Sequence, residues 1–239
     1  MALPIVNSAR YTMTIPSTGQ DVEFRPFLVK EEKVLMIAME SKDNKMMLKA
    51  LLDILKACIY DDINVKSLTS FDVEELFLRL RSKSVGETVS IQLKCSECGG
   101  MTPQEINLDG IKMSKGPEDK TVMITDDVGL QLTYPSIELV GKMDYDPEKT
   151  SKDKQLKMTM DMITNCIDSI FDKENVWDAK NQTKEELKEF IEGLNSSQFA
   201  KITNFFGSIP ALSHDASFTC IKCGSNEEVK LEGLHSFFT

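Results

Sequence analysis

Two stretches of the chain repeat apolar residues every three or four positions, which is the pattern of a helix with one buried face. These stretches span residues 44–60 and 153–172. Because the pattern continues through each stretch, it predicts one long helix over each of them. The apolar positions are Met47, Leu48, Leu51, Leu55 and Cys58 in the first and Leu156, Met160, Ile163, Ile167 and Ile170 in the second.

Two further helices that open with acidic residues are expected over 71–80 and 183–194, and a short one over 196–207. Thr183 is followed three residues later by Glu186. This spacing predicts a capping box, in which each side chain accepts a hydrogen bond from a backbone amide that the first helical turn leaves unpaired.

Between the helices, short alternating segments predict four β-hairpins. Residues 11–27 and 120–136 each resemble a hairpin that ends in a proline. Residues 93–108 and 218–231 each contain a short strand, a Cys-x-x-Cys-Gly turn and a second short strand. The alternation of Val89, Ile91 and Leu93 leads into the first of these turns.

The order of these features recurs along the chain, which favours an internal duplication. A hairpin, a helix that contains one cysteine, a helix with an acidic start and a Cys-x-x-Cys turn appear twice. We therefore expect an α+β fold, rich in helix, with tandem-duplicated halves at residues 1–115 and 116–239. The two halves are expected to pack as one compact unit, with small antiparallel hairpins and a zinc-ribbon-like site that joins the two Cys-x-x-Cys turns.

The paired cysteines are the clearest candidate chemistry. One turn with a two-residue spacer can place two thiolates on one ion, and four thiolates bind zinc tetrahedrally. A redox-active pair is the alternative, but a glycine turn and a strand follow the cysteines here, whereas thioredoxin-like motifs lead into a helix. We predict one structural zinc ion that holds the relative orientation of the two halves. Its expected ligands are Cys95, Cys98, Cys220 and Cys223, whereas Cys58 and Cys166 are expected to be inert core residues.

Charge and composition narrow the class of protein. The formal net charge is −10, with 38 acidic residues against 28 basic ones. The negative electrostatic field of such a protein repels the phosphate backbone and disfavours binding to nucleic acid. We find no apolar run near the ~18 residues that a membrane span needs, and no secretory signal. His214 and His235 are the only two histidines, and no familiar catalytic motif is present. A non-enzymatic protein of the cytosol is therefore expected.

Two longer motifs are "VEFRPFLVKEEKVLMIAMES" at 22–41 and "FDVEELFLRLRSKSVGE" at 71–87. Together with the two cysteine turns, they resemble baseplate proteins of T-even-like contractile-tailed phages, in particular the baseplate hub subunit and the related hub assembly protein. The resemblance implies a hub protein or hub assembly factor that acts through other phage baseplate or tail proteins. Its implied location is the host bacterial cytoplasm during assembly or the tail baseplate of the virion. A tail assembly chaperone is the alternative, and a zinc-ribbon protein that binds nucleic acid is a weaker one.

A partner surface is also predicted, at the junction between the first hairpin and the helix that follows. This segment combines apolar and basic side chains in "FRPFLVKEEK" at 24–33. The candidate contact residues are Phe24, Arg25, Phe27 and Lys30. The alternative interpretation is that both phenylalanines belong to the core.

Overall fold

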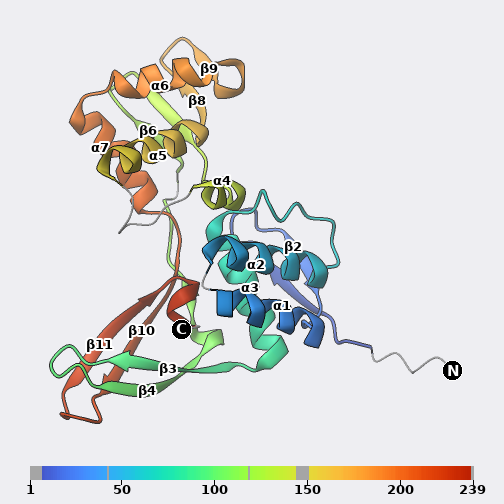
Figure 1. The fold of residues 1–239 in the computed structure, drawn as a ribbon. Coiled ribbons are helices and arrows are strands. Elements are labelled where there is room, and N and C mark those ends of the chain that lie inside the picture. Colours follow the sequence, from blue (N-terminus) through green and yellow to red (C-terminus); the bar gives the residue numbers. More distant parts are fainter. Residues whose placement is uncertain (1–6, 42, 118, 144–150, 238–239) are drawn as a thin grey trace. The chain divides into compact units, whose positions relative to one another are not determined.

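The computed structural model describes residues 7–41, 43–117, 119–143 and 151–237, and the chain divides into two compact units (Figure 1). Unit 1 contains Met1–Ser114 and Ala211–Thr239, and unit 2 contains Lys115–Pro210. The first boundary lies beside the predicted one after residue 115. The last segment differs from the prediction: residues 211–239 fall in unit 1, because their strands share a hydrophobic core with residues 78–111.

Three helices and a hairpin form the first part of unit 1. The antiparallel hairpin β1 (Tyr11–Thr14) and β2 (Asp21–Phe24) is followed by α1 (Val29–Ser41), α2 (Asn44–Cys58) and α3 (Ser70–Val85). The hairpin at 11–27 and the helices at 44–60 and 71–80 are thus confirmed. The helix α2 ends two residues earlier than predicted, and α3 continues to Val85. The buried residues of α2 and α3 include Ile54, Leu55, Leu76 and Leu80, and α3 is buried around most of its circumference.

Two more hairpins complete unit 1, and both carry a Cys-x-x-Cys turn. The strands β3 (Thr88–Lys94) and β4 (Met101–Asn107) pair with each other, as do β10 (Leu212–Thr219) and β11 (Asn226–Glu232). The short strand β5 (Lys112–Met113) pairs with the start of β10. One core joins the hairpins to Leu78 of α3 and to Phe237 in the 3-10 helix η3 (Leu234–Phe237), so η3 packs back onto the fold.

Unit 2 is a four-stranded antiparallel sheet with helices packed against it. The strand order is β6 (Thr121–Met123), β7 (Gly129–Leu132), β8 (Ile167–Phe171) and β9 (Val176–Asp178). The helices α5 (Lys152–Asn165), α6 (Lys184–Glu192) and α7 (Ser196–Gly207) share the hydrophobic core of the sheet, and the short helix α4 (Ile137–Lys142) follows β7 in the chain. The capping box of Thr183 and Glu186 is confirmed at the start of α6, and the short helix at 196–207 is confirmed as α7.

The single helix predicted over 153–172 is wrong in its second part. The helix α5 ends at Asn165, and Ile167 and Ile170 belong to β8. In β8 these residues pair with β7 and join the buried core of the unit. Isoleucine is β-branched and suits a strand as well as a helix, so spacing alone could not separate the two.

One local arrangement recurs in both units. After α2, the carbonyl of Cys58 accepts a hydrogen bond of 3.0 Å from the amide of Arg25, and Ile59 pairs with Phe24. After α5, the carbonyl of Cys166 accepts one of 2.7 Å from the amide of Thr133, and Ile167 pairs with Leu132. In each unit the chain leaves a helix at a buried cysteine and pairs with the second strand of the preceding hairpin. This correspondence supports the internal duplication, which stays a prediction.

Candidate metal centre

Each Cys-x-x-Cys turn is closed by its own backbone. In the β3–β4 hairpin the amide of Cys95 donates to the carbonyl of Gly100 at 2.9 Å, and the amide of Gly99 donates back to Cys95 at 3.0 Å. The β10–β11 hairpin repeats this with Cys220, Ser225 and Gly224, at 2.8 and 2.9 Å. Gly99 and Gly224 have φ angles of 66° and 77°, in the left-handed region that glycine tolerates. The glycine after the second cysteine is thus required by the shape of the turn.

The turn ends of the two hairpins lie side by side (Figure 1), and they bring the four sulfurs together. The Sγ atoms of Cys95 and Cys223 are 3.7 Å apart, and those of Cys98 and Cys220 are 3.6 Å apart. All four lie within 4.8 Å of one another. A tetrahedral zinc site with bonds of ~2.3 Å has sulfurs ~3.8 Å apart. The four predicted cysteines therefore form a set that could hold one metal ion.

Hydrogen bonds from the turns point at two of the sulfurs. The amide of Gly100 donates to Sγ of Cys98, and the amide of Lys222 donates to Sγ of Cys220, both at 3.4 Å. Such donors stabilise the thiolate that a metal requires. A Cβ atom on Gly100 would lie 3.0 Å from Cβ of Lys222, so this second glycine lets the two turns approach each other.

The thiols differ in acidity because their surroundings differ. The backbone amides of Cys223 and Lys222 donate to Cys220 and, with its thiol neighbours, lower its pKa to about 6. At Cys95 the amides of Cys98 and Glu97 act in the same direction. Burial and the neighbouring thiols outweigh them and raise its pKa to about 12. The backbone amides thus favour the thiolate at Cys220, whereas burial and the neighbouring thiols favour the protonated thiol at Cys95.

Side chains also link the two hairpins beside the cysteines. Glu227 on β11 accepts hydrogen bonds from the hydroxyl of Ser96 at 2.9 and 3.0 Å and from the thiol of Cys95 at 3.4 Å. The hydroxyl of Thr102 accepts a bond of 3.3 Å from the amide of Ile221. Sequence reasoning missed both residues, because nothing in the local pattern shows that a glutamate and a threonine face the other hairpin.

Outside this cluster the two other cysteines are buried. Burial raises the pKa of Cys58 to about 11 and that of Cys166 to about 12, so both thiols stay protonated. They behave as the inert core residues that the sequence predicts. Among the described residues, the four-cysteine set is the single group of three or more potential metal ligands close enough to share an ion.

The predicted partner residues lie mostly inside the fold. Phe24 and Phe27 are buried at 2% and 8% exposure, as in the alternative interpretation. Arg25 donates to Glu31 at 3.0 Å and to the carbonyls of Pro26 and Ala57 at 2.9 and 3.0 Å. The side chain of Lys30 is 72% exposed. Of the four, only Lys30 could meet a partner without a rearrangement of this junction.

The pair of Arg25 and Glu31 gives a prediction for stability and its pH dependence. Glu31 is buried, and it also accepts a hydrogen bond of 2.8 Å from the amide of Leu28 at the start of α1. Burial acts to raise its pKa, but the bonds from Arg25 and Leu28 outweigh burial, so its pKa lies below 4.5. Glu31→Gln should lower the free energy of unfolding by about 2 kcal/mol at neutral pH, because Arg25 loses its counter-charge.

The stabilisation from a carboxylate with a depressed pKa is present above the unfolded-state pKa and is lost as the pH falls through the folded-state pKa. The difference between wild type and Glu31→Gln should therefore shrink below pH 4.5. Urea unfolding at neutral and acidic pH measures it, with the exposed neighbour Glu32 changed to Gln as the matched control. A pH-independent difference would contradict the assignment.

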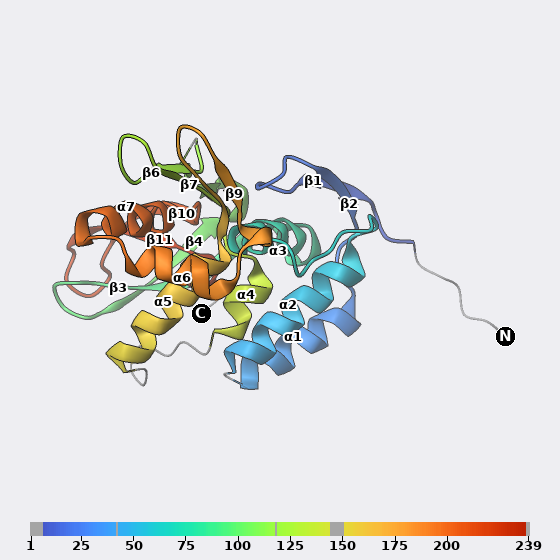
Figure 2. The same ribbon diagram turned by 90° about the horizontal axis from the view of Figure 1, so that it is seen from above.

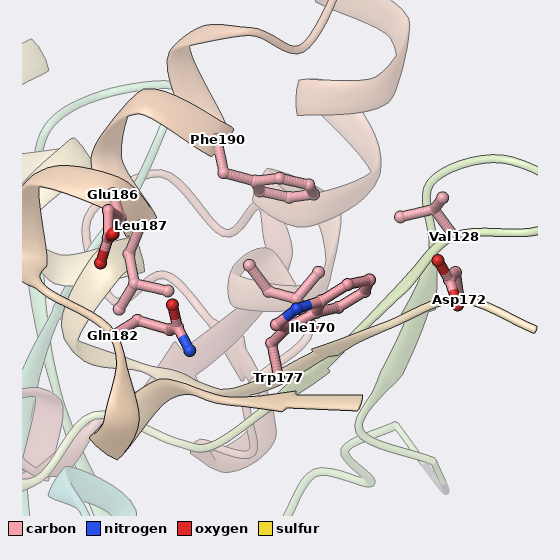
Figure 3. Close-up of a pocket in the computed structure, with 8 residues that line it drawn as sticks. All are labelled: Val128, Ile170, Asp172, Trp177, Gln182, Glu186, Leu187 and Phe190. Carbon is pink, nitrogen blue, oxygen red and sulfur yellow. The ribbon is translucent and has the colours of Figure 1, made fainter. Parts of the chain in front are cut away.

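Unit 2 contains a separate hollow of about 330 Å³ (Figure 3). Trp177 and Phe190 lie on opposite sides of it with Ile170 between them, and the carboxyl groups of Asp172 and Glu186 lie at opposite ends. Both carboxylates serve local structure: Asp172 accepts from the amides of the β8–β9 turn, and Glu186 belongs to the capping box of α6. The hollow is therefore an apolar depression without a pair of free acids for catalysis.

Three observations bear on the class of protein. Among the described residues, no helix combines the length and the apolar character that a membrane crossing requires. No curated protein and no solved structure matched the chain. In a comparison with protein families, residues 8–239 match the family described as T4 bacteriophage base plate protein. The match covers nearly the whole chain and confirms the resemblance to phage baseplate proteins, so the protein belongs to the T4 bacteriophage base plate protein family.

Proposed function

We propose that the protein is a non-enzymatic component or assembly factor of the baseplate hub, and that it acts through contacts with other phage baseplate or tail proteins. Family membership supports a structural role in the tail. The four-thiol cluster supports the absence of metal catalysis, because four protein ligands complete a tetrahedral site and leave no position for water or substrate.

Zinc is the metal that this donor set favours. The sulfurs come from two hairpins that are far apart in sequence. Cys98 and Cys220 are 122 residues apart, yet their Sγ atoms are separated by 3.6 Å, and Cys95 and Cys223 are 128 residues apart with Sγ atoms separated by 3.7 Å. Four thiolates in a tetrahedron are typical of structural zinc. This arrangement is the main support for the proposal of a structural protein in which a metal ion holds the two hairpins together.

The ion would bind Cys95 and Cys98 on one hairpin and Cys220 and Cys223 on the other. Since both hairpins belong to unit 1, the ion would close a loop of chain that contains all of unit 2. This differs from the expectation that zinc orients the two halves. Its role would be to hold the segment after residue 211 in place against the first part of the chain.

The role can be tested by quantitative mass spectrometry of purified phage particles and of assembly intermediates from infected cells. Stoichiometric presence in the particle would support a hub subunit of the virion. Presence in intermediates alone would support an assembly factor or a tail assembly chaperone in the host cytoplasm. Absence from both would contradict the proposal.

A further inference from the structure

The helix α1 exposes far more apolar surface than the other helices of unit 1. It buries only Glu31 and Ala38, although it runs for 13 residues beside α2 (Figure 2). Val29, Met36 and Ile37 are exposed at 67%, 57% and 62%. Val34 and Met39 flank them and are also exposed. An apolar patch of this kind on a folded protein marks a surface that another molecule covers.

The outward side of α1 has a regular order. Because successive residues turn by 100°, Val29, Lys33, Met36 and Glu40 fall on one line opposite the buried Glu31 and Ala38. Their spacing alternates between four and three residues, which is the spacing of a seam between two paired helices. Ile37 lies beside this line. The line thus places a lysine and a glutamate at opposite ends of an apolar centre.

We propose that this face of α1 pairs with the same face of a second copy of the protein. An isologous contact places the two helices antiparallel when the two-fold axis is perpendicular to them. With the axis between Met36 and Ile37, residue 33 of each copy lies opposite residue 40 of the other. Lys33 then faces Glu40 twice, and Met36 of each copy meets Ile37 of the other at the centre. A parallel arrangement would instead place lysine against lysine and glutamate against glutamate, so the charges select the antiparallel dimer.

The size of the surface sets the strength of the contact. A helix of this length is about 20 Å long, so the paired faces form a small interface of the transient class. Methionine side chains adapt to the surface opposite them, which suits a face with few large anchors. The dimer is therefore expected in the micromolar range and weaker at high salt, which screens the two ion pairs.

Charge reversal tests the pairing directly. In Lys33→Glu and in Glu40→Lys each cross-helix pair becomes a like-charged one, and dimerisation should weaken about tenfold. An equimolar mixture of the two variants restores both opposite-charge pairs, and the double variant does the same within one chain. Sedimentation equilibrium on the full chain should show dimers for wild type, the mixture and the double variant, and weaker association for each single variant.

The control Lys66→Glu reverses an exposed charge elsewhere in unit 1 and should leave the dimer unchanged. Circular dichroism of every variant should match wild type, because the substituted side chains are exposed. Met36→Asp should abolish association with the fold intact. A monomeric wild type at the highest concentration reached would overturn the proposal. A dimer insensitive to both reversals, or a mixture no tighter than its components, would do so equally.

Discussion

Replacing Cys98 with serine is expected to abolish metal binding and to lower the melting temperature of unit 1 by about 10 °C or more. The hydroxyl is a poor ligand in a four-sulfur site, and the β10–β11 hairpin would lose the metal ion that links it to β3–β4. Metal content by mass spectrometry should fall from one zinc per chain in wild type to near zero. Removal of the metal from the wild-type protein with a chelator should cause the same loss of stability.

The sequence offers a matched control and two separate probes. Cys166→Ala removes a buried thiol of unit 2 that lies outside the cluster, and it should keep one zinc per chain. Trp177 is the only tryptophan and lies in unit 2, so its fluorescence follows that unit, while circular dichroism also reports unit 1. Zinc-free wild-type protein, even after refolding with zinc, would contradict the metal site.

The second large effect is expected at Asp72, where alanine should lower the free energy of unfolding of unit 1 by about 3 kcal/mol. Asp72 is fully buried, and its carboxylate accepts bonds from the amide and hydroxyl of Ser17 at 2.8 and 2.6 Å. It also accepts a bond of 2.9 Å from the amide of Thr69 and so closes the capping box of α3. Its removal would leave the buried amide of Thr69 and the partly buried amide and hydroxyl of Ser17 without this acceptor.

Glu186→Ala is the matched control for this prediction. Glu186 holds the same position in the capping box of α6, but it is exposed and bonds only within that box. Its loss should cost about 1 kcal/mol, the usual contribution of a cap. Urea unfolding followed by circular dichroism and by Trp177 fluorescence measures both variants. Equal costs at the two sites would show that the long-range bonds to Ser17 contribute nothing.

These two sites differ in how far the sequence could predict them. The metal ligands follow from the Cys-x-x-Cys-Gly pattern, because two thiols in one tight turn are a local property of the chain. The capping box at Thr183 is local in the same way. The bond from Asp72 to Ser17 spans 55 residues, and no spacing rule connects the two. An acidic residue near a helix start predicts a cap but not burial against a distant hairpin.

The incorrect expectations have a common origin. The second half of the 153–172 helix and the assignment of residues 211–239 to the second half both extend a local pattern past the point where distant pairing decides. Ile167 and Ile170 fit a helix by spacing, yet β7 offers them a partner strand. The exposure of α1 could not be read either, since its apolar residues have the composition of a core helix.

The sequence by itself determined the α+β class, most helices and hairpins, the four-cysteine set and the baseplate family, because each depends on short-range spacing or on motifs within one segment. Only the tertiary structure decided which hairpins share a core, which carboxylate is buried and which apolar helix face stays exposed. Those outcomes depend on contacts between residues far apart in the chain. Their free energies arise from burial and long-range hydrogen bonds, which no local pattern contains.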